Sequence, residues 1–357
     1  MIRNACVFIW TFTFIIFTTN LAHADKLNEP NLWKTECIGR YQIGMPGEVE
    51  IALSSAMHLF RPEPDTRFRF NDEVIADSSI GYTVYPKMNI NESFVFMKNI
   101  KNMFDKNIAE RYQESHTVMD RKYAHWIFFG DELNKMDFAW VDPDGYSLFI
   151  YRDGNYFNFG TSFVKSNNPA KNTEKAISAL NMDINTFHPR PLYHLPKQPG
   201  VCIPYGFIAD DGTAPRNIAV TMRLIDHPDV EIFFQDSSYQ LSPGEHSDSK
   251  QEILLFLDQY ARKQKYVDTG FWGTHSIQMS GQKGRGNFFT IARKDDTIDY
   301  GYIASVKGDF TARTDTPAQM LYVIRTASRA KGAPVSKDEI KDIAEKIMAS
   351  VKRHPVQ

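Results

Sequence analysis

Short segments rich in hydrophobic and aromatic residues, bounded by polar and turn residues, recur in the first half of the chain. They predict β-strands at Cys37–Ile43, Val49–Leu53, Trp126–Phe129, Asp137–Val141, Tyr146–Arg152 and Tyr156–Phe163. The turn sequences Asp142–Gly145 and Asp153–Gly154 separate the last three of these strands. Successive strands joined by such short turns indicate antiparallel pairing.

Helical periodicity interrupts and then closes this series of strands. Asn91 caps a predicted helix with apolar residues at a three-to-four spacing, at Phe94, Met97, Ile100, Phe104 and Ile108. Asn168 and Pro169 begin a second predicted helix, in which Ala176, Ile177 and Leu180 share one face. The first half therefore reads as two strands, a helix, several strands and a helix.

The second half repeats this order. Strands are predicted at Ile218–Leu224, Val230–Phe234, Gly273–Met279, Asn287–Arg293, Thr297–Val306 and Met320–Thr326. Capping boxes at Ser249–Glu252 and Ser336–Glu339 begin two helices. Their apolar residues are Ile253, Leu254, Leu257 and Tyr260 in the first, and Ile340, Ile343, Ala344, Ile347 and Val351 in the second. The sequence thus predicts an α+β fold with two similar domains, each a mainly antiparallel sheet with two helices in the order β-β-α-β-β-β-α. A chance similarity of pattern is the alternative to duplication.

The first 24 residues have the pattern of a secretory signal peptide. Arg3 precedes an apolar run at Cys6–Phe17, and Ala22–Ala24 is a small-x-small cleavage site. The apolar run is shorter than the roughly 20 residues that a membrane-spanning helix needs. An uncleaved membrane anchor is the alternative, and the polar residues after Ala24 argue against it. We expect cleavage after Ala24 and an exported, soluble mature protein.

The length of the mature chain predicts two domains. Without residues 1–24, the 357-residue chain is about twice as long as the commonest domains. The segment His188–Pro199 contains four prolines, which restrict it to extended conformations. We therefore place an N-terminal domain at residues 25–195 and a C-terminal domain at residues 196–357.

Two cysteines remain after the signal peptide, and each lies near the start of one half. Cys37 lies within Trp33–Tyr41, and Cys202 lies within Pro199–Phe207. An exported protein passes into an oxidising compartment, where disulfides form and persist. The matching positions therefore predict a disulfide between Cys37 and Cys202. Two separate buried thiols are the alternative.

Charge and composition exclude one class of partner. The formal net charge is -2, and the sequence has no run of five like charges. Nucleic acid is therefore not expected as a partner, because binding it needs a concentrated basic surface. Aromatic residues make up 13% of the chain, which fits β-sheet cores and also fits an aromatic recognition surface. Composition alone does not separate these two uses.

Motifs for catalysis are missing from the sequence. It contains no Gly-x-Ser-x-Gly nucleophile elbow, no His-Glu-x-x-His zinc motif and no Gly-x-x-x-x-Gly-Lys-Ser/Thr phosphate loop. The glycine-rich Gly281–Gly286 lies between two predicted strands, which favours a hairpin over an anion site. We interpret Ala209–Gly212 as an acidic loop and the pairs Asp142/Asp144 and Asp295/Asp296 as turns. His188 and His194 are expected to be exposed. The sequence predicts no catalytic, cofactor-binding or metal-binding residue.

Two short motifs resemble a known family. Trp33–Pro46 reads Trp-x-x-Glu-Cys-Ile-Gly-Arg-Tyr-x-Ile-x-Met-Pro. It resembles the N-terminal opening of the immunity proteins paired with the fourth family of type VI secretion lipase effectors. Gly200–Ile208 resembles the start of the C-terminal domain of those proteins.

The resemblance implies a periplasmic antitoxin with two domains. Such a protein binds a phospholipase that is delivered into the periplasm and blocks its access to membrane lipid. An inhibitor of this kind needs a complementary surface and no cofactor or catalytic group. The resemblance carries over no effector-binding residues, which stay unassigned.

Two other classes of protein remain open at this point. An exported solute-binding protein would also have two domains, but it would show strand–helix alternation around a parallel sheet. An uncharacterised exported enzyme would require a cluster of perturbed titratable groups in a cleft. A lipase gene with a Gly-x-Ser-x-Gly motif beside this gene would favour the immunity function.

Overall fold

The structure is a computed structural model of the whole chain. It describes residues 33–61, 65–76, 83–85, 95–106, 123–129, 137–162, 168–212, 216–238, 266–268, 274–309, 316–332 and 334–354. The predicted signal peptide and the helix predicted from the capping box at Ser249–Glu252 lie outside these residues. In the described part, no helix is both long enough and apolar enough to cross a membrane.

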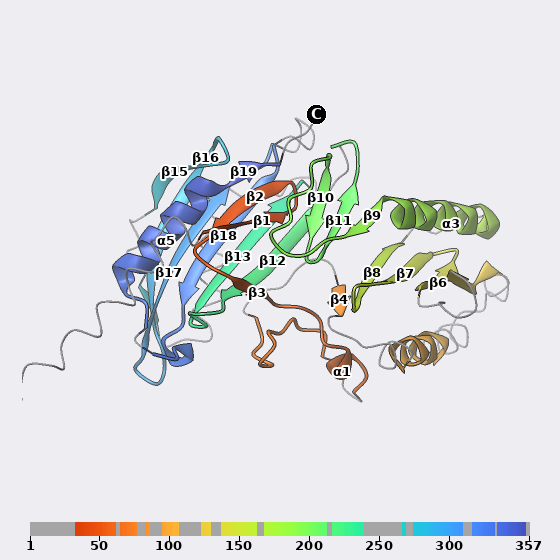
Figure 1. Ribbon diagram of the computed structural model, residues 1–357, viewed down its shortest axis with the longest axis horizontal. Coiled ribbons are helices and arrows are strands. Elements are labelled where there is room, and N and C mark those ends of the chain that lie inside the picture. Colours follow the sequence, from red (N-terminus) through yellow and green to blue (C-terminus); the bar gives the residue numbers. More distant parts are fainter. Residues whose placement is uncertain are drawn as a thin grey trace, which may run out of the picture.

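An eight-stranded sheet forms the larger of two main bodies (Figure 1). Its strands follow the order β14 (Tyr266–Asp268), β16 (Gln282–Ala292), β17 (Ile298–Val306), β18 (Ala318–Arg325), β13 (Val230–Ser237), β12 (Asn217–Leu224) and β3 (Val49–Ile51). The remaining strand, β15 (His275–Met279), pairs with β16. Every pairing is antiparallel, as the run of consecutive strands predicts.

Helix α5 (Lys337–Ser350) covers one face of this sheet. It begins with a capping box, in which the Ser336 amide donates to Glu339 Oε2 at 2.7 Å and Ser336 Oγ accepts from the Glu339 amide at 3.4 Å. The buried side of the helix carries the predicted Ile340, Ile343, Ala344 and Ile347, and it packs on β17 and β18. The predicted closing helix is confirmed, because its cap and its apolar stripe are both local signals.

A five-stranded sheet forms the second body. Its order is β4 (Thr83–Tyr85), β8 (Asn155–Ser162), β7 (Gly145–Arg152), β6 (Asp137–Asp142) and β5 (His125–Phe129), again with antiparallel pairing throughout. Alternate residues face opposite sides of the sheet. Phe138, Phe149 and Tyr156 form one cluster with Phe96 and Ile100 of the helical residues 95–106.

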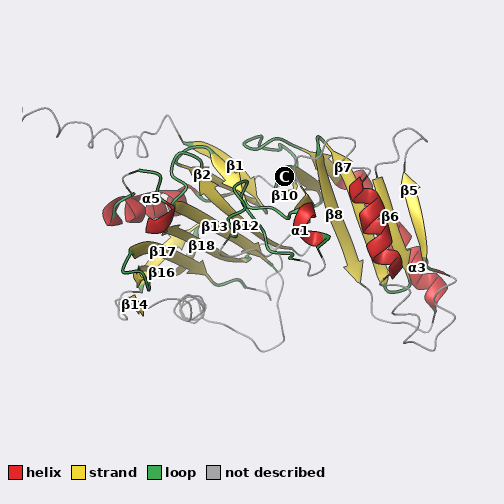
Figure 2. Cartoon of the chain, turned by 90° about the horizontal axis from the view of Figure 1, so that it is seen from below, coloured by secondary structure: helices red, strands yellow, loops and turns green. Residues whose placement is uncertain are grey.

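Helix α3 (Pro169–Thr186) covers the other face of the five-stranded sheet (Figure 2). Its Ala176 and Leu180 are fully buried, as predicted. Asn168 caps the helix by accepting a hydrogen bond from the Lys171 amide, and Pro169 occupies the first turn. The short helix α1 (Ala56–Leu59) and a single 3-10 turn at Ala327–Arg329 complete the described helices.

Two three-stranded sheets link these bodies. In each of them, a hairpin from one half of the chain pairs with a short strand from the other half, so the two halves exchange hairpins. The hairpin β1 (Lys34–Ile38) and β2 (Tyr41–Met45) comes from the first half, but it pairs with β19 (Lys352–Arg353), which follows α5. The hairpin β10 (Gly200–Ile203) and β11 (Gly206–Ala209) comes from the second half, but it pairs with β9 (Phe187–Pro189), which follows α3. Figure 1 shows the red β1 and β2 beside the blue β19.

The single strand predicted over Cys37–Ile43 is wrong. The chain turns between β1 and β2, and Ile38 pairs with Tyr41. Gly39 adopts φ +59 at this turn, a left-handed conformation that glycine reaches without a steric penalty. A side chain at this position would also collide with the Asp236 carboxylate.

The α+β class and the antiparallel pairing are confirmed. The two similar domains and their boundary near residue 195 stay predictions. In space, β3 of the first half pairs with β12 in the large sheet, so strands from both halves of the sequence build that sheet.

Candidate functional site at the linked hairpins

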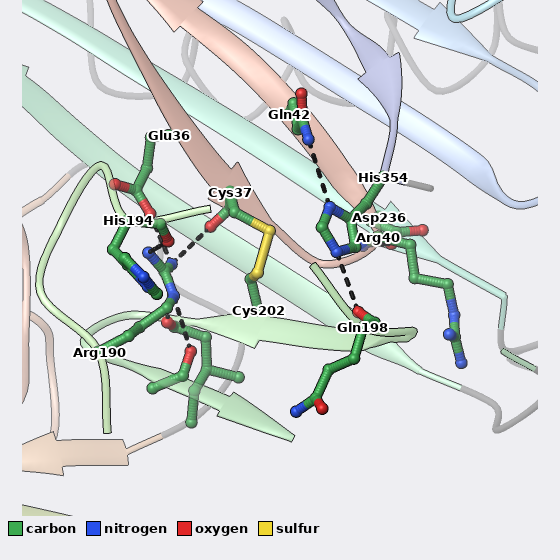
Figure 3. The surroundings of a disulfide bond; sticks show 12 residues. Glu36, Cys37, Arg40, Gln42, Arg190, His194, Gln198, Cys202, Asp236 and His354 are labelled. Carbon is green, nitrogen blue, oxygen red and sulfur yellow. Dashed lines mark hydrogen bonds and ion pairs between the residues drawn. A yellow bond between two sulfur atoms is a disulfide. The ribbon is translucent and has the colours of Figure 1, made fainter. Parts of the chain in front are cut away.

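Cys37 and Cys202 form a disulfide where the two exchanged hairpins meet (Figure 3). Their Cα atoms are 5.7 Å apart, within the range that a disulfide spans. Backbone hydrogen bonds extend the link, because the Gly39 amide donates to the Cys202 carbonyl at 2.9 Å and the Cys202 amide donates to the Gly39 carbonyl at 2.8 Å. Both cysteines are buried. The predicted disulfide therefore joins two segments that lie at the start of different halves.

A buried ion pair lies beside the disulfide. Arg190, which follows β9, donates from Nη2 to Glu36 Oε1 at 2.5 Å and to the Cys37 carbonyl at 2.8 Å. Its Nε donates to the Gly206 carbonyl at 3.0 Å. The second carboxylate oxygen of Glu36 accepts from the Tyr193 amide at 2.5 Å. Arg190 therefore ties both hairpins to the proline-rich segment, and hydrogen bonds satisfy charges that burial would otherwise penalise.

A second pair of charges holds the turn between β1 and β2. Arg40 donates from both terminal nitrogens to the Asp210 carboxylate, at 2.7 and 2.5 Å. The Arg40 amide donates to Asp236 Oδ2 at 2.9 Å, and Arg216 Nε donates to the same oxygen at 2.5 Å. Bidentate pairs of this kind fix orientation as well as charge. Through Asp210 and Asp236, these bonds fasten the first hairpin to the segment after β11 and to β13.

Equivalent hydrogen bonds recur on the two sides of the disulfide. The Arg190 amide donates to the Tyr205 carbonyl at 3.0 Å, and the His354 amide donates to the Arg40 carbonyl at 2.6 Å. Cys37 and Cys202 are 165 residues apart, and the same spacing separates Arg40 from Tyr205. In both three-stranded sheets, the short strand after a long helix therefore pairs with the hairpin in the same register.

Burial shifts the pKa of two groups near this site. Burial lowers the pKa of His354, whose Nε2 lies 3.1 Å from the Gln198 carbonyl and whose Nδ1 lies 3.3 Å from Gln42 Nε2. A neutral ring that donates from Nε2 and accepts at Nδ1 satisfies both contacts. Burial, together with the charge of Asp236, raises the pKa of Tyr41 to about 12.

The other candidate residues from the sequence shape turns, form ion pairs or lie exposed at the surface. Asp210 of the acidic loop binds Arg40, and the paired aspartates shape turns, since Asp142 accepts from the Asp144 amide and Asp295 accepts from the Thr297 amide. His188 and His194 are exposed and line an open pocket of about 450 Å³ beside the hairpins. Among the described residues, no group of three His, Cys, Asp or Glu side chains could hold a metal ion.

Sequence reasoning missed Glu36, Arg190 and His354. Arg190 and His354 each stand in a short segment after a predicted helix and beside a proline. The sequence did contain a signal for them: each segment follows the last helix of its half, and both lie at nearly the same sequence distance after the cysteine motif of that half. The partners of these residues are far away in the sequence, so that signal gave no pairing.

Residues 194–355 match the family model described as Tle cognate immunity protein 4 C-terminal domain. No curated protein matches the chain at a significant level. Two solved structures are similar over 92% of this chain and the full length of the matched chain, each at 14% identity. One is the immunity protein TplEi of the type VI secretion system from Pseudomonas aeruginosa in complex with "L" peptide, with a TM-score of 0.54. The other is the Tle4-Tli4 complex, with a TM-score of 0.55.

The overall fold is similar to that of a solved immunity protein. At this identity the solved structures establish the fold alone. The assignment to a family comes from the sequence match of residues 194–355. Residues 194–355 of the chain belong to the family of Tle cognate immunity protein 4 C-terminal domains. The resemblance read from the two cysteine motifs is thereby confirmed.

Proposed function

We propose that this protein binds a phospholipase effector of the type VI secretion system in the periplasm and blocks its access to membrane lipid. The observation that carries the proposal is the family match over residues 194–355, within a fold that an immunity protein shares over nearly the whole chain. One structure of that fold is a complex named for both Tle4 and Tli4, so a protein of this shape binds a partner of that name.

The protein acts by binding and needs no catalytic step. Buried charges and a disulfide hold the linked hairpins between the two sheets, so the two bodies reach the partner already positioned. Preorganisation of this kind reduces the entropy lost on association. The antiparallel pairing in both main sheets also argues against the solute-binding alternative, which would have strand–helix units around a parallel sheet.

Location and domain boundaries are part of the same proposal. Residues 1–24 direct export and are removed after Ala24, and the Cys37–Cys202 disulfide suits the oxidising periplasm. The N-terminal domain covers residues 25–195 and the C-terminal domain covers residues 196–357. The family match, which begins at residue 194, supports that boundary.

A protection experiment tests the proposal. The lipase encoded beside this gene, given a periplasmic signal, should arrest or lyse the cells that express it. Co-expression of the full chain should rescue these cells. Deletion of residues 1–24 should abolish the rescue, because the inhibitor then stays in the wrong compartment. Failure of the full-length exported chain to protect against the lipase would reject the immunity function.

A further inference from the structure

Strand β16 carries two cations that alternate with two glycines. A Cβ atom at Gly284 would collide with the Ser305 carbonyl, and one at Gly286 would collide with the Tyr302 hydroxyl. Both glycines therefore face the packed side of the sheet. Because side chains alternate along a strand, Lys283 and Arg285 face the opposite side, and both are exposed. Gly281–Gly286 forms the end of the turn and the first part of β16 in the β15–β16 hairpin, as expected, and it also displays two positive charges.

These cations line an open groove of about 760 Å³. Ser276 and Gln278 of β15 lie along it, where they pair with Arg285 and Lys283 across the two strands. Lys307, directly after β17, adds a third positive charge. Among the described residues, no Asp or Glu lines the groove. Within the described part of the chain, none of the three cations takes part in an ion pair.

We propose that this groove binds an extended acidic segment of the effector protein, an inference that rests on the function proposed above. The formal net charge of the chain is -2, yet three cations gather here, and no carboxylate of a described residue lines the groove with them. Their mutual repulsion is relieved when carboxylates from a partner lie between them. The groove therefore supplies a charge-complementary surface for a protein segment rich in Asp or Glu.

The neighbouring strand favours an extended segment. Among the described strands, β15 pairs only with β16, so its second edge presents backbone N–H and C=O groups. An added strand can pair with such an edge while its side chains reach those of the adjacent strand. A segment bound along β15 would lie two strand spacings, about 10 Å, from β16, a distance that the long side chains of Lys283 and Arg285 can span towards its carboxylates.

A membrane surface is the competing anionic partner, and the distribution of apolar side chains argues against it. Membrane-bound surfaces combine cations with apolar side chains that enter the lipid. The large hydrophobic residues exposed in the described part are Val95, Phe128, Met182, Ile225 and Ile298. None of them lines the groove.

A labelled hexaglutamate peptide tests the groove directly, without the effector. Its fluorescence anisotropy is measured with the mature chain at about 50 mM NaCl, where exposed charges are weakly screened. The groove variant is Lys283→Glu/Arg285→Glu/Lys307→Glu. The control variant, Lys98→Glu/Lys171→Glu/Lys175→Glu, changes net charge equally at exposed lysines on the helices of the five-stranded sheet.

We expect the groove variant to lose at least about tenfold in peptide affinity, and the control to stay within about twofold. Hydrogen exchange at residues 275–279 should slow when the peptide binds. The neutral variant Lys283→Gln/Arg285→Gln, melted alongside the wild type, separates loss of binding from loss of folding. Equal losses in the groove and control variants would overturn the proposal. So would capture of phosphatidylglycerol vesicles by the groove without binding of hexaglutamate.

The neighbouring lipase separates this inference from the immunity function. If wild-type protein inhibits the lipase, the groove variant should inhibit with at least about tenfold weaker affinity and the control should match the wild type. Equal inhibition by all three proteins would overturn the groove and leave the immunity function standing. If wild-type protein does not inhibit the lipase but still binds hexaglutamate through the groove, the proposed function fails while the acidic ligand of the groove remains.

Discussion

Removal of the Cys37–Cys202 disulfide should destabilise the protein without changing its fold. The bond closes a loop across a sequence separation of 165 residues. In the chain-entropy model, a loop of this length restricts the unfolded chain by about 5 kcal/mol, and measured losses of native disulfides are typically about 2–5 kcal/mol. The native state should persist, because the Gly39–Cys202 backbone bonds and the Arg190–Glu36 pair still hold the hairpins together.

The double variant Cys37→Ala/Cys202→Ala tests this reasoning by thermal unfolding, followed by circular dichroism. At about 2–4 °C per kcal/mol, the melting midpoint should fall by roughly 5–15 °C. Reductant should lower the wild-type midpoint towards that of the variant and leave the variant unchanged. Reduced wild type keeps both sulfur atoms, so it separates the cross-link from the small cavity that alanine creates. A midpoint of the double variant equal to that of the oxidised wild type would refute the argument.

Three further predictions concern the same site. Arg190→Met should cost about 3–5 kcal/mol in the free energy of unfolding, because Glu36 would stay buried without its partner, and Glu36→Gln in the same chain should recover part of the loss in denaturant titrations. Gly39→Ala should lower the melting midpoint by more than a surface substitution does, since alanine is strained at φ +59 and meets the Asp236 carboxylate; an unchanged midpoint would show that the turn relaxes freely. Folding lowers the pKa of His354. The neutral ring therefore contributes to the free energy of unfolding above the unfolded-state pKa, and this contribution is lost as the pH falls from the unfolded-state pKa towards the folded-state pKa. The unfolding free energy should therefore drop more between about pH 7.5 and 5.5 in the wild type than in His354→Gln, and identical pH profiles would contradict this assignment.

Local patterns account for the parts of the fold that the sequence predicted. The capping box at Ser336 and the apolar stripe of α5 lie within one helix, and the turns at Asp142–Gly145 and Asp153–Gly154 join adjacent strands. Signals of this kind involve residues a few positions apart. They identified nearly all the long strands and both long helices within the described residues.

The exchange of hairpins could not be predicted in this way. β19 contains two residues and pairs with β2, which lies near the other end of the chain. Neither a two-residue strand nor such a distant pairing leaves a periodic pattern. The matched cysteine motifs indicated that Cys37 and Cys202 meet, but they did not show that each hairpin pairs with the strand after the other half's helix.

The candidate site, too, was predicted only in part from the sequence. The cysteines were found because two similar motifs surround them. The charges that accompany them were missed because Glu36 directly precedes the strand predicted at Cys37–Ile43 and Arg190 lies within a segment interpreted as a linker. Only the folded chain brings the two side chains to 2.5 Å. Lys283 and Arg285 were visible in the sequence, but the direction of their side chains depends on the close packing of Gly284 and Gly286.

Titration of the neighbouring lipase with the mature chain tests the central claim most directly. Hydrolysis of a phospholipid substrate is followed at a fixed lipase concentration well above the dissociation constant, while the chain is added in steps. A binding inhibitor is consumed as it acts, so activity should fall linearly and end at one molecule of this protein per molecule of lipase. Undiminished hydrolysis at a large excess of the chain would contradict the account, and so would complete loss of activity at trace amounts.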